Sequence, residues 1–69
     1  MDNLEMNELK NEILHVIQDE DDAYHTYLAL SDLAKELGNR RLQKKFEQFA
    51  FDELEHFNYL EKLLSIMRI

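Results

Sequence analysis

Two glutamates and one histidine stand at positions where hydrophobic residues otherwise prevail: Glu20, Glu53 and His56. Each belongs to a segment whose hydrophobic residues recur every three or four positions, which is the spacing of one face of a helix. Carboxylates and an imidazole are costly on such a face unless they are paired, and no Lys or Arg shares these faces at that level. A metal ion is the partner that suits two carboxylates and one imidazole together. The pattern therefore predicts metal binding inside a helical bundle.

Two long helices are expected to position these residues. The first face reads Ile13, Ile17, Glu20, Tyr24, Tyr27, Ser31, Ala34, and the second reads Leu42, Phe46, Phe49, Glu53, His56 or Phe57, Leu60, Leu64, Met67. The chain has no Pro and one Gly, so neither segment is interrupted. Strand signals are missing, and the predicted fold class is all-α.

The expected arrangement is a single antiparallel hairpin that spans residues 1–69. We predict one helix over about residues 4–37, a turn at 38–39 and a second helix over about residues 40–67. Gly38 suits a left-handed C-cap for the first helix, and Asn39 suits an N-cap for the second. Two helices alone make a poor core, and the chain has no Cys for a disulfide. We therefore expect two hairpins to pair into an antiparallel four-helix bundle.

The three polar residues are expected to lie at one level of the hairpin. Glu20 precedes Gly38 by 18 residues, and His56 follows it by 18. At a rise of 1.5 Å per residue, Glu20, Glu53 and His56 all lie about 22–27 Å from the turn. The sequence therefore brings three potential ligands together on facing sides of two helices.

The Glu-x-x-His pattern occurs twice, and the helical angle separates the two copies. His15 of the first copy lies about 140° around the helix from Glu20, so it is expected to face solvent. His56 lies only about 60° from Glu53, on the apolar face. We predict that the second copy alone contributes to a site.

A two-fold dimer would double the ligands to four carboxylates and two imidazoles. This set matches the carboxylate di-iron pattern, in which two helices supply one Glu each and two supply Glu-x-x-His. Glu53 from each chain is expected to bridge two metals about 4 Å apart, with Glu20 and His56 completing each coordination sphere. Such ligands favour two Fe per dimer, with Mn or Zn as substitutes.

Composition restricts the remaining partners. A net charge of −7 argues against nucleic acid, and no segment is long and apolar enough to span a membrane. No N-terminal stretch resembles a signal peptide, so we expect a cytoplasmic protein, or one inside a protein compartment in the cytoplasm.

Five basic residues cluster near the turn and form either a solvated tip or a docking site for an acidic partner: Lys35, Arg40, Arg41, Lys44 and Lys45. Five further hydrophobic residues lie off the two faces and mark either contacts between dimers or isolated exposed positions: Leu33, Phe51, Leu54, Tyr59 and Ile66.

The chain resembles the ferritin-like di-iron superfamily, and rubrerythrins most closely, over about residues 17–64. The likeness rests on the segments Glu-Asp-Asp-Ala-Tyr-His-Thr-Tyr at 20–27 and Phe-Glu-Gln-Phe-Ala-Phe-Asp-Glu-Leu-Glu-His at 46–56. The resemblance implies that Glu20 and His56 are terminal iron ligands and that Glu53 is a bridging ligand. It also implies that Tyr27 hydrogen-bonds to a ligand from outside the coordination sphere.

The chain departs from that family or from its half-length relatives in four respects. It carries one hairpin rather than two, which makes it similar to the half-length encapsulated ferritin-like proteins that build their iron site across a dimer interface. A short capsid-targeting tail after a flexible linker is not apparent. Ala23 stands where rubrerythrins carry an additional Glu. A rubredoxin domain is absent because there is no Cys, so an electron donor is expected to be a separate protein.

Three functions are compatible with these observations. The first is a homodimeric or larger oxidoreductase in which a di-iron site reacts with O2 or peroxide, as a ferroxidase or as a peroxidase. The second is an oligomer that binds or stores metal without turnover. The third is a metal-free helical interaction module whose polar groups set the helix register.

Overall fold

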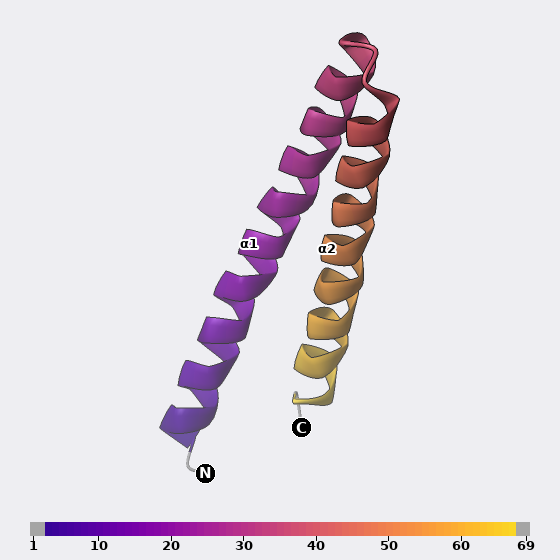
Figure 1. The fold of residues 1–69 in the computed structure, drawn as a ribbon. Coiled ribbons are helices and arrows are strands. Elements are labelled where there is room, and N and C mark those ends of the chain that lie inside the picture. Colours follow the sequence, from indigo (N-terminus) through magenta and orange to yellow (C-terminus); the bar gives the residue numbers. More distant parts are fainter. Residues whose placement is uncertain (1–2, 68–69) are drawn as a thin grey trace.

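The computed structural model describes residues 3–67, which form two antiparallel helices packed side by side (Figure 1). Helix α1 covers Asn3–Glu36 and helix α2 covers Arg40–Ile66. The hairpin is elongated, with dimensions of 54 × 15 × 12 Å. The predicted all-α fold class and the pairing of two helices are confirmed.

The turn between the helices follows from two adjacent residues. Gly38 has φ of +74°, in the left-handed region where a residue with a Cβ is strained. The Asn39 amide donates to the Ala34 carbonyl at 2.9 Å and the Gly38 amide donates to the Lys35 carbonyl at 3.0 Å. This Schellman pattern ends α1 at Glu36, one residue before the predicted end. The Asn39 side chain then accepts from the Leu42 amide at 3.0 Å, as expected for an N-cap.

Gly38→Ala tests the backbone strain at the turn. A Cβ at this position would meet no atom within 4 Å, so the only penalty comes from the left-handed conformation. We expect the free energy of unfolding to fall by about 1–2 kcal/mol, and Gly38→Asn to cost less because Asn tolerates this region better. Chemical denaturation of the two variants beside the native protein measures both values. An unchanged midpoint for Gly38→Ala would contradict this account of the turn.

The hairpin buries very little by itself. Among the described residues only Ala34, Ala50 and Ser31 are buried, and no large hydrophobic side chain is fully buried. The Ser31 hydroxyl crosses between the helices and donates to the Gln43 carbonyl at 3.3 Å. Small residues allow the helices to approach closely here, but they supply little hydrophobic stabilisation. The isolated hairpin therefore lacks the core that a stable domain requires.

A second set of hydrophobic residues runs along one edge of the helix pair at seven-residue spacing, and we call it the open face. It comprises Leu9, Val16, Ala23 and Leu30 on α1, Leu37 in the turn, and Leu42, Phe49 and Leu63 on α2, together with the polar His56. The rings of Tyr27 and Phe49 lie 5.4 Å apart, and Glu20 contacts His56, so contacts between the helices follow this edge. None of these nine residues is buried, and Leu37 is 84% exposed. Such spacing is typical of helices that pack against further helices.

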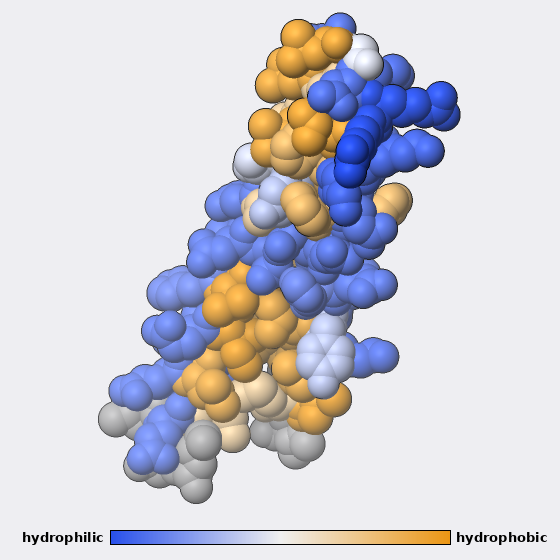
Figure 2. All heavy atoms as spheres, viewed as in Figure 1, coloured by the Kyte–Doolittle hydropathy of each residue, from blue (hydrophilic) through white to orange (hydrophobic). Residues whose placement is uncertain are grey.

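Hydropathy is unevenly distributed over the surface. Figure 2 shows hydrophobic side chains gathered near the turn and again in the lower part of the hairpin, with hydrophilic side chains between them. Of the five off-face hydrophobic residues, Leu54 is half-buried, and the others are exposed: Leu33, Phe51, Tyr59 and Ile66. Neither helix contains a stretch apolar enough to cross a membrane within residues 3–67.

Candidate metal centre

Glu20, Glu53 and His56 come together across the two helices. Glu20 lies near the middle of α1, and Glu53 and His56 lie one turn apart on α2. One potential ligand atom from each residue lies within 4.8 Å of the other two. The structure thus places at one level the three residues that the sequence put at similar distances from the turn. No other group of three His, Asp or Glu residues meets this condition in the described part of the chain.

The imidazole of His56 lies close to both carboxylates. Its Nδ1 atom is 3.4 Å from Oε2 of Glu20 and 3.9 Å from Oε2 of Glu53. These separations are longer than a good hydrogen bond between such groups. The three side chains are therefore close enough to share one ion without holding each other in a closed hydrogen-bonded network.

One carboxylate oxygen has no hydrogen-bond partner. Oε2 of Glu20 is buried, and it accepts no hydrogen bond from any described residue. A buried polar atom without a partner is rare because it loses its hydration without replacement. A cation at this position would satisfy it, and two carboxylates with one imidazole form an oxygen-rich donor set suited to iron or manganese. The residues present therefore fit a metal ion.

The site is open on one side. The side chains of Glu20 and Glu53 are 21% and 20% exposed, whereas that of His56 is 60% exposed. His56 belongs to the open face, between Phe49 and Leu63. Sequence periodicity did not decide whether His56 or Phe57 lies nearer the seam, and in the structure Phe57 is half-buried while His56 is exposed. One hairpin thus supplies three candidate ligands and leaves the outer side of the site uncovered.

Tyr27 lies beside the same edge of the hairpin. Its ring contacts Phe49, with the ring centroids 5.4 Å apart and tilted by 60°. The side chain is half-buried, and its hydroxyl makes no hydrogen bond to the described residues of its own chain. Its role as a hydrogen-bond partner of a metal ligand stays a prediction.

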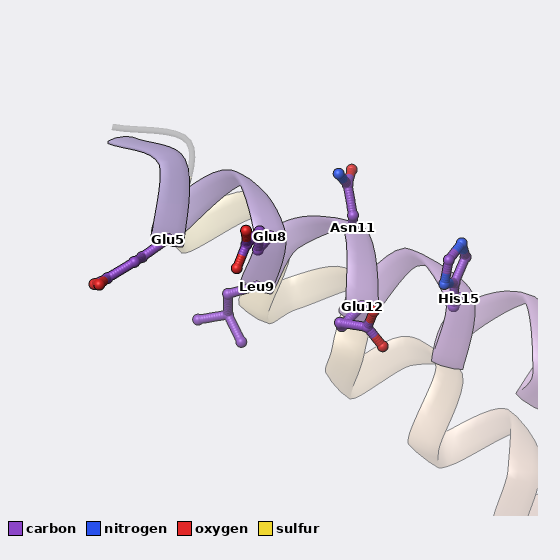
Figure 3. A pocket seen from close by; sticks show the side chains of 6 residues that line it. All are labelled: Glu5, Glu8, Leu9, Asn11, Glu12 and His15. Carbon is purple, nitrogen blue, oxygen red and sulfur yellow. The ribbon is translucent and has the colours of Figure 1, made fainter. Parts of the chain in front are cut away.

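The other two histidines lie away from this cluster. His25 is exposed, and its Nδ1 atom lies 2.9 Å from the backbone carbonyl oxygen of Asp21. His15 is exposed too, as expected from its helical angle. It borders a shallow surface hollow whose lining residues all come from α1 (Figure 3): Glu5, Glu8, Leu9, Asn11, Glu12 and His15. Within residues 3–67, Glu12 and His15 of the first Glu-x-x-His copy therefore join no group of three potential metal ligands.

Comparison with models of protein families shows to which family the chain belongs. The family model described as Rubrerythrin matches residues 12–69, which include the whole candidate centre. The chain belongs to the rubrerythrin family. Comparison with curated proteins and with solved structures gave no match. Iron binding is typical of the rubrerythrin family, and the cluster of Glu20, Glu53 and His56 provides a carboxylate and histidine group of the kind that such binding needs.

Proposed function

We propose that this rubrerythrin-family hairpin forms a homodimer with a di-iron centre at the interface, and that the centre reacts with O2 or peroxide. The observation that carries the proposal is the open cluster of Glu20, Glu53 and His56, in which a buried carboxylate oxygen lacks a hydrogen-bond partner. A second copy would cover the open face and bring a second cluster to the first. Two Fe per dimer is the expected content, with Mn or Zn as substitutes.

The distribution of hydrophobic residues supports the dimer. The open face carries Leu9, Val16, Phe49 and Leu42 at 41–46% exposure, so the hairpin leaves nearly half of each of these side chains uncovered. Burying the part of one such side chain that is still exposed contributes about 1 kcal/mol, less than half of the value for a fully exposed side chain. Several of them on two copies offset the loss of freedom on association. The same surface surrounds the metal cluster, so one contact would complete both the core and the site.

The residues have separate tasks in the proposed reaction. Glu20, Glu53 and His56 hold the iron, and their two carboxylates compensate its charge in a half-buried place. Bound iron supplies one-electron chemistry toward O2 or peroxide. Tyr27 is proposed to fix the orientation of a ligand carboxylate of the dimer, and the rings of Tyr27 and Phe49 limit the access of water from the turn side. A separate electron donor would be required for repeated turnover with peroxide.

Oxygen consumption after anaerobic loading with Fe(II) tests this function. We expect oxygen uptake in proportion to the iron that is bound, together with absorbance in the oxo-bridged ferric region. His56→Ala should abolish both, while His15→Ala should retain them because His15 is exposed and remote from the cluster. Bound iron that consumes no oxygen would indicate storage without turnover. A protein that binds no iron would leave the metal-free interaction module.

A further inference from the structure

Helix α2 carries a second row of exposed side chains, on the side that faces away from α1. They recur every three or four positions, and we call them the outer stripe: Phe51, Glu55, Tyr59, Lys62 and Ile66. At about 100° per residue the five lie within an arc of about 80°, and each lies about 100–180° around the helix from the buried Ala50. Because α1 packs against only one side of α2, the hairpin leaves the outer stripe largely exposed (Figure 1).

The outer stripe contains three large hydrophobic side chains. Phe51, Tyr59 and Ile66 are 61–64% exposed, against 42% for Phe49 beside the metal cluster. They lie about 80–160° around α2 from Phe49, so the proposed dimer would leave them exposed. Exposed hydrophobic side chains that gather at helical spacing are typical of a surface that packs against another helix.

The two charged members of the outer stripe indicate which helix that is. Glu55 and Lys62 are exposed, and neither forms an ion pair within residues 3–67. The midpoint between Glu55 and Lys62 falls between residues 58 and 59, and so does the midpoint between Phe51 and Ile66. Two copies of α2 that run in opposite directions about a two-fold axis at this point therefore bring each Glu55 beside Lys62 of the other copy. The same axis brings each Phe51 beside Ile66 of the other copy, and Tyr59 beside its own copy.

The charges disfavour the parallel alternative. In a parallel pair Glu55 would face Glu55 and Lys62 would face Lys62, so both contacts would join like charges. The antiparallel pair forms two contacts between opposite charges instead. Lys62 is the only Lys or Arg among residues 46–67, so no other position in this part of α2 could supply the partner of Glu55.

We infer that the outer stripe is a second interface between copies of this chain, in which two α2 helices pack antiparallel. Helix axes in such contacts are about 8–10 Å apart, which suits both hydrophobic packing and contact between Glu and Lys side chains. The interface shares no residue with the metal cluster. A dimer formed through the open face carries two outer stripes, so assembly through them gives species of four or more chains.

Reversal of one charge provides the first test. Lys62→Glu converts both Glu–Lys contacts to Glu–Glu contacts, and it is expected to raise the dissociation constant of this interface about tenfold at low salt. Adding Glu55→Lys to the same chain should restore the native value, because the pairs then form with their charges exchanged. Sedimentation velocity at low and high salt measures both changes.

Lys44→Glu is the matched control for net charge. Lys44 is exposed on the same helix and the substitution changes the charge of the chain by the same amount. The position opposite Lys44 in the antiparallel pair falls beyond the end of α2, so the interface should keep its native strength. Equal weakening by Lys62→Glu and Lys44→Glu, or no recovery in the double variant, would overturn the antiparallel interface.

Cross-linking provides a second test, which depends neither on iron nor on activity. The chain has no Cys, so one engineered Cys is the only thiol in each copy. Asn58→Cys places it beside the proposed axis, whereas Gln48→Cys places it on the same side of α2 but about ten residues from the axis. In the antiparallel pair the two copies of position 48 lie about 30 Å apart along the helices. A short bifunctional maleimide should therefore join two copies of the Asn58→Cys variant and not two copies of the Gln48→Cys variant.

The outcomes distinguish this interface from the proposed function. Cross-linking of Asn58→Cys alone, in iron-free protein as well, would support the antiparallel pair. Cross-linking of both variants would indicate a parallel pair, and cross-linking of neither would show that the outer stripe does not join copies of the chain; either result overturns the inference. A protein that cross-links at Asn58→Cys but binds no iron would contradict the proposed function and support the inference.

Discussion

Glu53→Ala is expected to abolish iron binding and, with it, the stabilisation that iron provides. Glu53 lies 3.9 Å from His56 and is one of the three candidate ligands that residues 3–67 of each chain bring together. Loss of one ligand should weaken Fe(II) binding by at least about 100-fold, because even groups outside the coordination sphere contribute 10–100-fold. Metal at 100 times its dissociation constant stabilises the native protein by about 2.7 kcal/mol. Thermal unfolding under anaerobic conditions, with and without Fe(II), measures the loss.

The prediction also covers the stability of the Glu53→Ala variant in the absence of metal. Glu53→Ala removes a half-buried carboxylate, so the metal-free variant should be as stable as the metal-free native protein or more stable. Glu55→Ala is the matched control, since Glu55 is exposed on the same helix and does not join the cluster. It should retain iron binding. If Glu53→Ala kept the native response to Fe(II), Glu53 would not be a ligand.

Phe49→Asp is expected to prevent dimerisation and to unfold much of the chain. Phe49 is 42% exposed and contacts Tyr27 on the open face. A dimer would bury it completely, so the substitution removes about 1.5–3 kcal/mol of hydrophobic stabilisation per chain and places a charge in the interface. A hairpin with so small a core does not stay folded alone. We expect the dissociation constant of the dimer to rise by at least about 100-fold. The helical signal in circular dichroism should fall in parallel.

Phe51→Asp is the control for this experiment. Phe51 is 61% exposed and lies about 160° around α2 from Phe49, on the side away from the open face. It should leave the dimer and its helical content nearly unchanged. Light scattering and circular dichroism over a range of protein concentrations compare the two variants. Equal effects at both positions would show that the open face has no special part in assembly.

Much of the fold could be predicted from the sequence because the helical periodicity of the two segments and the capping preferences of the residues between them indicate the same hairpin. The single Gly-Asn pair between two uninterrupted periodic segments fixes the turn, and the observed caps at Gly38 and Asn39 follow the expected chemistry. α1 ends one residue early because the Schellman hydrogen bonds take Leu37 into the turn. Element boundaries depend on such individual bonds, which periodicity does not resolve.

The proximity of Glu20, Glu53 and His56 was predictable from the sequence, whereas the environment of the cluster was not. Similar distances from Gly38, 15 residues for Glu53 and 18 for Glu20 and His56, were enough to place the three residues at one level. Periodicity could not choose between His56 and Phe57 for the seam, because neighbouring residues differ by only about 100° in direction. The burial of one Glu20 oxygen and the exposure of His56 depend on side-chain packing. These two features, rather than the motif, show which side of the site is open.

The mass of the intact complex tests the interfacial metal centre most directly. The protein is loaded with Fe(II) without oxygen, freed of excess iron and examined by native mass spectrometry. We expect a dimer that carries two irons, and no iron on any monomer, because each cluster is incomplete until a second copy covers its open side. A monomer that retains one iron, or a dimer that remains free of iron, would contradict a metal centre shared between two hairpins.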